Sequence, residues 1–239
     1  MITTLNALKF DFSEDYRSNL NALITHINQC EEGSIIVAPE VVFTGFDYAN
    51  LEKASEFSIE AINEVLLHVN NKIVIFTTIE KKVDGFYNFA QILHKNKVVY
   101  KQAKAKLFTF AREHDYFIEG NSKEISIVEV AGIKIAILIC FELRFKELWK
   151  QVEGADVIAV PAFWGKNRAK HYVTLTNALA IVNQCYVIAS DAVSESTGGE
   201  CGIITPFGHE FRNENRAIVS HPYQVKEIQK MRRYMNVGI

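Results

Sequence analysis

Apolar residues recur along the chain at two spacings, and the two spacings alternate. Residues 20–27 place leucine and isoleucine every three or four positions, which is the spacing of an amphipathic helix. Residues 34–39 (SIIVAP) follow as a short apolar run after a glycine, typical of a buried strand. Residues 62–69 and 72–80 (KIVIFTTIE) repeat this order. The pattern therefore predicts two successive helix–strand units.

The middle of the chain reads as two hairpins. Residues 87–100 (YNFAQILHKNKVVY) contain two apolar runs separated by a turn at residues 95–97. Residues 124–140 (EISIVEVAGIKIAILIC) do the same across a turn at residues 131–132. Both segments therefore predict pairs of antiparallel strands.

The last third returns to mixed elements, and no linker-like stretch, internal repeat or low-complexity tract separates it from the rest. Helices mixed with hairpins and buried strands indicate an α/β fold in layers, whose apolar sheet faces need cover on both sides. We expect residues 1–239 to form a single domain. The remaining predicted elements are a helix, a strand, a longer helix, a strand and a final strand pair around a turn, at residues 143–153, 156–162, 168–184, 185–190 and 206–208.

Composition narrows the classes of protein that fit. The 26 basic and 28 acidic residues are scattered and give a net charge of −2, which is unlike the basic footprint of a nucleic-acid-binding protein. No apolar run approaches the roughly 20 residues that span a bilayer, and the first residues lack the pattern of a secretory signal. The four cysteines form no CxxC pair, which argues against a zinc site or a disulfide scaffold. We expect a soluble, cytoplasmic protein whose partner is a small molecule, with no nucleic acid and no membrane.

One cysteine stands where an apolar run meets charge. In IAILICFELRF, residues 135–145, Cys140 follows five apolar residues and precedes Glu142 and Arg144. Free cysteine is often buried, so Cys140 fits a small apolar residue of the core. It also fits a nucleophile, because the carboxyl end of a strand before a helix is where α/β sheets usually bind ligands. The positive end of a helix there would favour a thiolate. The local sequence leaves both readings open.

A nucleophilic thiol needs a base, and none of the seven histidines lies in a context typical of a cysteine protease or a metal site. Glu40 ends the apolar run SIIVAP and is a candidate base, although an ordinary polar residue at a strand end fits equally well. Lys104, in YKQAKAKLF, is by itself one of several lysines that solvent would accommodate. Taken singly, neither residue identifies a site.

Four segments together resemble the nitrilase superfamily, the carbon-nitrogen hydrolases, in their order along the chain. PEVVFTGF matches the segment that carries the family's general base, which implies this role for Glu40. KAKLF and CFELRF match those of the catalytic lysine and nucleophile, which implies Lys104 and Cys140. EHDYFIEG matches the segment of an auxiliary glutamate, Glu113. The likeness continues through GADVIAVPAFW, NALAIVNQCYVIAS and GIITPFG and so covers nearly the whole chain.

The resemblance implies hydrolysis of a C–N bond through a thioester on Cys140. Glu40 would take the thiol proton and return it to the leaving nitrogen, and Lys104 with the backbone N–H of Phe141 would stabilise the oxyanion. Glu113 would hold Lys104 in place. The implied reaction needs no metal or organic cofactor. The aromatic residues next to the matched segments are candidates for the wall of the substrate pocket, although core packing explains them as well: Phe46, Phe141, Phe163 and Trp164.

The resemblance also implies an α-β-β-α sandwich whose subunits pair through helices into a homodimer or higher oligomer. Glu142 and Arg144 would form an ion pair that braces the turn of Cys140. The alternative is an ordinary ion pair on the protein surface. Some positions depart from the family pattern without touching the proposed catalytic residues, which puts the packing and the subunit interface in doubt: Lys106, Asn177, Leu179, Val182, Cys201 and Thr205.

Within the superfamily, the CFELRF segment and the short chain are most similar to the omega-amidase-like branch, which acts on small dicarboxylate monoamides. Hydrolysis of N-carbamoyl amino acids or N-carbamoyl-β-alanine, or of a nitrile, is the alternative within enzymes. A different class is a family member without catalysis that serves as a binding or regulatory subunit. The presence of all four polar residues argues against this class, because a site that has lost its reaction has no chemical reason to keep them.

Overall fold

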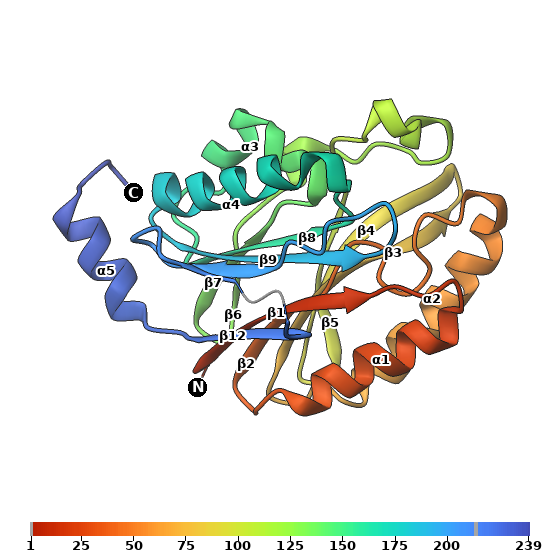
Figure 1. Ribbon diagram of the computed structural model, residues 1–239, viewed down its shortest axis with the longest axis horizontal. Helices are drawn as coiled ribbons and strands as arrows, with labels where there is room; N and C mark the ends of the chain where they lie inside the picture. The colour runs from red at the N-terminus through yellow and green to blue at the C-terminus, as the bar shows by residue number, and fades with distance from the viewer. Residues whose placement is uncertain (1, 213–214) are drawn as a thin grey trace.

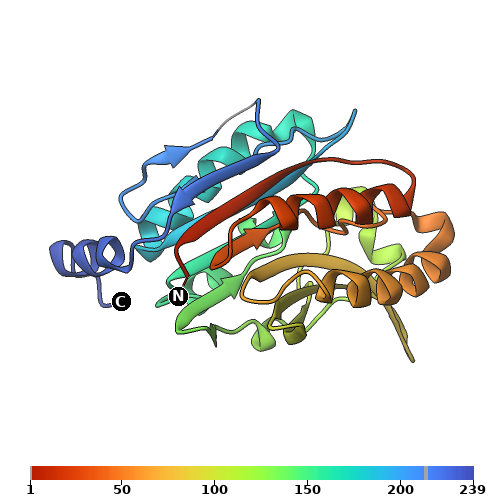
Figure 2. The same ribbon diagram turned by 90° about the horizontal axis from the view of Figure 1, so that it is seen from below.

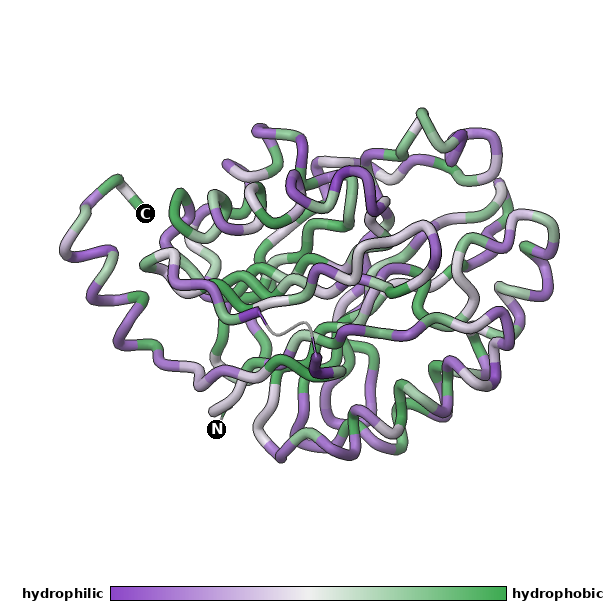
Figure 3. Tube along the Cα trace, in the orientation of Figure 1, coloured by the Kyte–Doolittle hydropathy of each residue, from purple (hydrophilic) through white to green (hydrophobic). Residues whose placement is uncertain are grey.

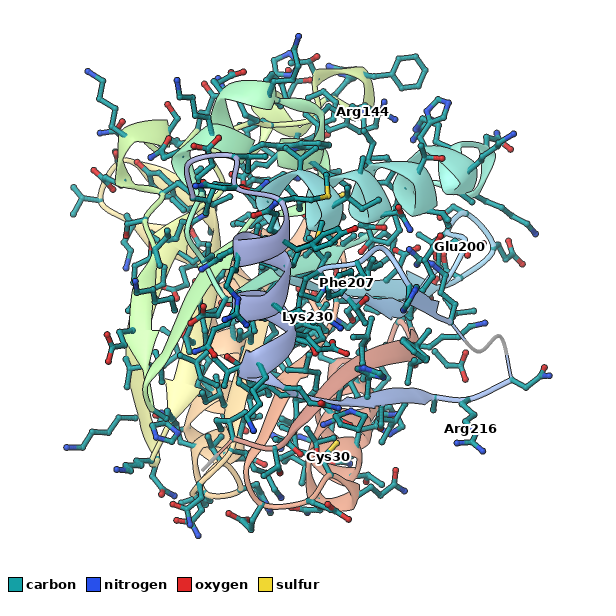
Figure 4. The ribbon with its side chains drawn as sticks, turned by 90° about the vertical axis from the view of Figure 1, so that its left-hand side faces the viewer. Cys30, Arg144, Glu200, Phe207, Arg216 and Lys230 are labelled. Atoms are coloured by element: carbon teal, nitrogen blue, oxygen red, sulfur yellow. The ribbon has the colours of Figure 1, made fainter. Side chains whose placement is uncertain are left out.

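The computed structural model describes residues 2–212 and 215–239 and arranges them in four layers (Figure 1). Two β layers pack face to face in the middle, and a pair of helices covers the outer face of each. The α-β-β-α sandwich implied by the sequence is therefore confirmed. A last helix lies at the edge of the molecule, beside the layers (Figures 1 and 4). The α-helices are α1 (Tyr16–Gln29), α2 (Leu51–Leu66), α3 (Lys146–Gln151), α4 (Ala169–Asn183) and α5 (Val225–Tyr234).

The first β layer has the strand order β5-β4-β3-β2-β1-β12, in which β1, β2 and β3 run parallel. Helices α1 and α2 lie side by side across its outer face (Figure 2). Its strands are β1 (Thr4–Asp11), β2 (Ser34–Val37), β3 (Ile73–Lys82), β4 (Gly85–His94), β5 (Lys97–Ala103) and β12 (Ile218–Pro222).

The second β layer has the order β6-β7-β8-β9-β10-β11, with β7, β8 and β9 parallel. Strand β1 joins the two layers, because Thr4–Ala7 pairs with β2 while Lys9–Asp11 pairs with β9. The carboxyl ends of parallel strands from both layers therefore meet in one region. The strands of this layer are β6 (Val128–Val130), β7 (Ile133–Ile137), β8 (Val157–Ala162), β9 (Tyr186–Val193), β10 (Gly202–Ile204) and β11 (Glu210–Phe211).

Strands buried on both faces explain the uninterrupted apolar runs of the sequence. Side chains alternate across a strand, so Ile35 and Val37 of β2 face the core between the two β layers, whereas Ile36 packs under α1 and α2. On the opposite side, Tyr172 of α4 is fully buried and donates a hydrogen bond to the carbonyl of Val160 in β8, at 2.9 Å. The apolar segments accordingly gather along the central strands, while polar ones follow the outer helices (Figure 3).

Both predicted hairpins are present, with two-residue turns. Lys95 and Asn96 have φ of 50° and 58°, and Ala131 and Gly132 have φ of 53° and 78°. Positive φ at both central residues gives a turn whose twist matches that of the flanking strands. The predicted strand pair around residues 206–208 is also confirmed, since β10 and β11 pair antiparallel across this turn.

The helix predicted at residues 143–153 is shorter than expected. Cys140–Arg144 forms a 3-10 turn, and Phe145 is extended, so α3 begins only at Lys146. Cys140 has a φ of 44°, in the left-handed region, which bends the chain sharply after β7. Strands β1 and β12 and helix α5 were not among the predicted elements. In the described part of the chain, no helix has the length and apolar character needed to cross a membrane.

Candidate active site

The ends of strands from both β layers bring the predicted catalytic residues together. Glu40 follows β2, Lys104 follows β5 directly, and Cys140 follows β7. The backbone N–H of Glu40 donates to the carbonyl of Ala162 at the end of β8, at 3.3 Å, so the two layers are joined next to the site. The side chains that the sequence separates by up to a hundred positions therefore share one pocket, as expected for a site at the carboxyl ends of parallel strands.

Lys104 lies between two carboxylates. Its Nζ donates to Glu40 Oε1 at 2.7 Å and to both oxygens of Glu113 at 2.9 Å. All three residues are at most 4% exposed. Glu113 also accepts the backbone N–H of Phe108 at 2.9 Å, which fixes it in place. The ammonium of Lys104 thus occupies the space between the two carboxylates, and the described residues hold no cluster suited to a metal ion.

Burial and charge act against each other in this cluster. Burial raises the pKa of Glu40, and the adjacent Lys104 ammonium partly opposes that rise. Burial by itself would lower the pKa of Lys104, but the charges of Glu40 and Glu113 outweigh it and the pKa rises. Lys104 therefore remains an ammonium ion, and Glu40 takes up a proton more readily than an exposed glutamate does.

Cys140 contacts this cluster through its thiol. The thiol lies close enough to the Glu40 carboxylate to lower the pKa of Glu40, and the backbone N–H of Phe163, which donates to Glu40 Oε2 at 3.2 Å, also lies near the sulfur. Burial, followed by the negative charge of Glu40, raises the pKa of Cys140 well above its usual value. The resting thiol is therefore protonated, and Glu40 lies beside it as a candidate acceptor for its proton. The structure thus brings Glu40, Lys104, Glu113 and Cys140 together; their catalytic roles remain predictions.

The predicted ion pair between Glu142 and Arg144 is wrong. Glu142 is fully buried and accepts the backbone N–H groups of Ala105 at 2.6 Å and Ile139 at 2.7 Å. It therefore ties the segment after Lys104 to the segment before Cys140. Burial raises the pKa of Glu142 to about 7, with the two N–H donors acting in the opposite direction. The glutamate braces the turn of Cys140, as expected, but through backbone groups.

Arg144 instead turns toward the pocket. Its guanidinium lies 4.9 Å from the ring centroid of Trp164, and Nη2 is 3.1 Å from Nδ1 of His171. A second guanidinium, that of Arg168, lies 5.1 Å from the ring centroid of Phe108. Burial lowers the pKa of Arg144, and the positive charge of Arg168 lowers it further. In residues 2–212 and 215–239, no carboxylate forms an ion pair with either arginine.

The two arginines and Cys140 line one narrow pocket with a cavity volume of about 30 Å³. Three of the four aromatic residues predicted to wall it do so: Phe141, Phe163 and Trp164. Phe46 does not line it. Its ring centroid lies 5.7 Å from Lys104 Nζ and 5.7 Å from that of Phe163, on the side of a second, wider hollow. Substrate binding by these four residues remains a prediction.

Two residues of the site were missed from the sequence. Asn88, in β4, donates from Nδ2 to Glu40 Oε1 at 2.8 Å. Arg168 precedes α4 and lines the pocket. A single asparagine within an apolar strand carries no signal for a catalytic contact, and Arg168 stands among Lys166 and Lys170 without any pattern to distinguish it.

Known amidases are similar to this chain in sequence, and a known member of the nitrilase superfamily is similar to it in fold. The chain is 30% identical over 218 residues to 2-oxoglutaramate amidase of Bacillus subtilis, covering 86% of this chain and 83% of that protein. It is 30% identical to the omega-amidase YafV of Yersinia enterocolitica, covering 77% and 72%. Nit3 of Saccharomyces cerevisiae, a member of branch 10 of the nitrilase superfamily, has the same fold, with a TM-score of 0.87, 20% identity and coverage of 99% and 95%.

The profile of the carbon-nitrogen hydrolase family matches residues 9–213, most of the chain. The match spans the segments of Glu40, Lys104, Glu113 and Cys140 and the strands that position them. The chain therefore belongs to the carbon-nitrogen hydrolase family.

Proposed function

We propose that this hydrolase cleaves the terminal amide of a small monoamide that carries a free carboxylate, releasing ammonia through a thioester on Cys140. The observation that carries the proposal is the placement of Glu40 beside the Cys140 thiol and in direct contact with the Lys104 ammonium, at 2.7 Å. A base, a nucleophile and a cation gathered away from bulk water are the parts that acyl transfer from an amide needs. The names of the similar amidases support the same reaction.

The proposed first half-reaction moves one proton twice. Glu40 takes the proton from the Cys140 sulfur as that sulfur bonds to the amide carbon. The oxyanion that forms is stabilised by the Lys104 ammonium and by the backbone N–H of Phe141. Glu40 then gives its proton to the amide nitrogen, the C–N bond breaks, and ammonia leaves. The product is a thioester between the acyl group and Cys140.

The second half-reaction repeats these roles with water. Glu40 removes a proton from a water molecule, whose oxygen bonds to the thioester carbon. The C–S bond then breaks and the sulfur recovers the proton from Glu40. The acid is released and the enzyme returns to its starting state. Glu113 keeps the Lys104 ammonium in position during both halves through its paired hydrogen bonds.

The pocket indicates the chemistry of the substrate's other end. Arg144 and Arg168 bring two positive charges to the wall of a pocket that also contains Cys140. Guanidinium groups pair well with carboxylates, and uncompensated positive charge in a partly buried site favours an anionic ligand. The cavity is narrow, about 30 Å³, which suits a small ligand better than a bulky one. A dicarboxylate monoamide meets both conditions, since its amide reaches Cys140 while its carboxylate faces the arginines.

N-carbamoyl amino acids are the second candidate, because they also combine a cleavable C–N bond with a carboxylate and would use the same two arginines. A nitrile offers no feature that this pocket favours. A binding or regulatory subunit would have no chemical use for a protonated thiol, a base and an ammonium placed together.

Ammonia release from a panel of small molecules tests the proposal. The panel contains monoamides with a free carboxylate, the same amides with that carboxylate esterified, N-carbamoyl amino acids and nitriles. We expect the first group to have the highest kcat/KM. A higher kcat/KM for the carbamoyl compounds would replace the proposed substrate by the second candidate. Absence of ammonia from every compound would contradict the proposed function.

We also propose that two copies pair through α4 and the C-terminal segment, in the cytoplasm. Ile181 and Val182 of α4 are 43% and 53% exposed, next to Met235 and Val237, which are 50% and 60% exposed. These residues line one apolar hollow, and large exposed apolar patches often mark interfaces. Light scattering on the protein as it elutes from a size-exclusion column should give the mass of a dimer. The same measurement on the Val182→Asp variant should give the mass of a monomer. A monomeric parent would contradict the pairing.

A further inference from the structure

The two oxygens of the Glu40 carboxylate have different surroundings. Oε1 accepts hydrogen bonds from Lys104 Nζ at 2.7 Å and from Asn88 Nδ2 at 2.8 Å. Among the described residues, Oε2 accepts one hydrogen bond, from the backbone N–H of Phe163, at 3.2 Å. A carboxylate oxygen has about two lone-pair sites. Both sites of Oε1 are thus taken, and Oε2 is the oxygen with a site left for the proton of Cys140.

Asn88 contributes to this asymmetry from both its side chain and its backbone. While its amide holds Glu40, its carbonyl oxygen accepts the backbone N–H of Lys104 at 2.8 Å. The residue is 1% exposed, and its Oδ1 has no hydrogen-bond partner among the described residues. A buried amide with an unpaired oxygen is costly, so an apolar residue of similar size would suit the strand better unless the Nδ2 donor is needed.

We propose that Asn88 is a positioning residue for the base: its Nδ2 donor holds Glu40 with Oε1 toward Lys104 and Oε2 toward the Cys140 thiol. The inference rests on the proposed function for its role in turnover. Without this donor, the carboxylate rotates more freely between Lys104 and Cys140. The ionised form of Glu40 also loses one of the hydrogen bonds that stabilise it, which raises the pKa of Glu40.

Gln91 offers a matched control on the same strand. It is also a fully buried amide that donates to a carboxylate, that of Glu80 at 3.0 Å, and its Oε1 likewise has no partner in the described part of the chain. It makes no contact with Glu40, Lys104 or Cys140. The test therefore compares Asn88→Leu with Gln91→Met, since each change removes one amide and keeps most of the side-chain volume.

In turnover, we expect Asn88→Leu to lower kcat roughly tenfold to a hundredfold with little change in KM. We expect the acid limb of kcat/KM to move to higher pH by roughly one unit, because the base is ionised only at higher pH. Gln91→Met should leave kcat and the acid limb as in the parent, whatever its effect on the thermal unfolding temperature. An unmoved acid limb in Asn88→Leu, or an equal movement in Gln91→Met, would overturn the inference.

Alkylation of Cys140 by iodoacetamide tests the same point without a substrate. The rate is followed across pH by peptide mass, which separates Cys140 from the other cysteines. Asn88→Leu should again move the half-maximal rate to higher pH, and Gln91→Met should not. This readout stands even if the parent hydrolyses no amide, so it separates a failure of the positioning role from a failure of the proposed function.

Discussion

Cys140→Ala should lower ammonia release from the best amide substrate by at least about a thousandfold. The change removes the thiol that lies beside Glu40, and with it the proposed covalent intermediate. The Lys104 ammonium and its two carboxylates stay in place, so binding should change little. Parent enzyme quenched with acid during turnover should show the mass of the acyl group added to the Cys140 peptide, and the variant should show none.

Cys30→Ala serves as the matched control, because it removes a buried thiol at the end of α1. Cys30 and Arg144 lie at opposite ends of the view in Figure 4, so Cys30 is remote from the pocket. We expect this variant to retain parental activity. Hydrolysis by Cys140→Ala at more than about a tenth of the parental rate would show that the reaction does not pass through a thioester on this residue.

Arg168→Ala should lower kcat/KM for a carboxylate-bearing amide about tenfold to a hundredfold, mainly through a higher KM. A hydrogen bond to a charged group contributes about 1.5–3 kcal/mol, which corresponds to this range. The same variant should hydrolyse an esterified or otherwise neutral amide as well as the parent does, since the catalytic contacts of Glu40, Lys104 and Cys140 do not involve Arg168. Initial rates on the charged and neutral amides measure the difference.

Arg216→Ala controls for the loss of one positive charge. Arg216 is exposed and its side chain points away from the layers, well removed from Arg144 (Figure 4). It should leave both amides unaffected. If Arg168→Ala reduces the rates on the charged and the neutral amide equally, Arg168 shapes the pocket instead of binding the carboxylate. Arg144→Ala should behave as Arg168→Ala does, although its contacts with Trp164 and His171 add a packing effect.

Glu142 and Arg144 show that a sequence motif predicts where residues lie along the chain but not which way their side chains point. The sequence placed both residues next to the nucleophile, and the resemblance suggested that they pair. In the structure, however, Glu142 points toward buried N–H groups and Arg144 toward the pocket. A spacing of two residues in a sharp turn does not fix which way each side chain points, because that depends on the segments packed against it.

The local pattern determined helices α1, α2 and α4, the hairpins and the layered α/β class, because hydrophobic periodicity and turn residues act over a few positions. Four short motifs in a fixed order determined the family and the residues to examine. The tertiary structure decided that Lys104 and Asn88 both donate to the same oxygen of Glu40, that Cys140 lies beside this carboxylate, and that Arg144 and Arg168 share a pocket. These arrangements join β2, β4, β5, β7 and the start of α4, and contacts between segments so distant leave no trace in the neighbouring sequence.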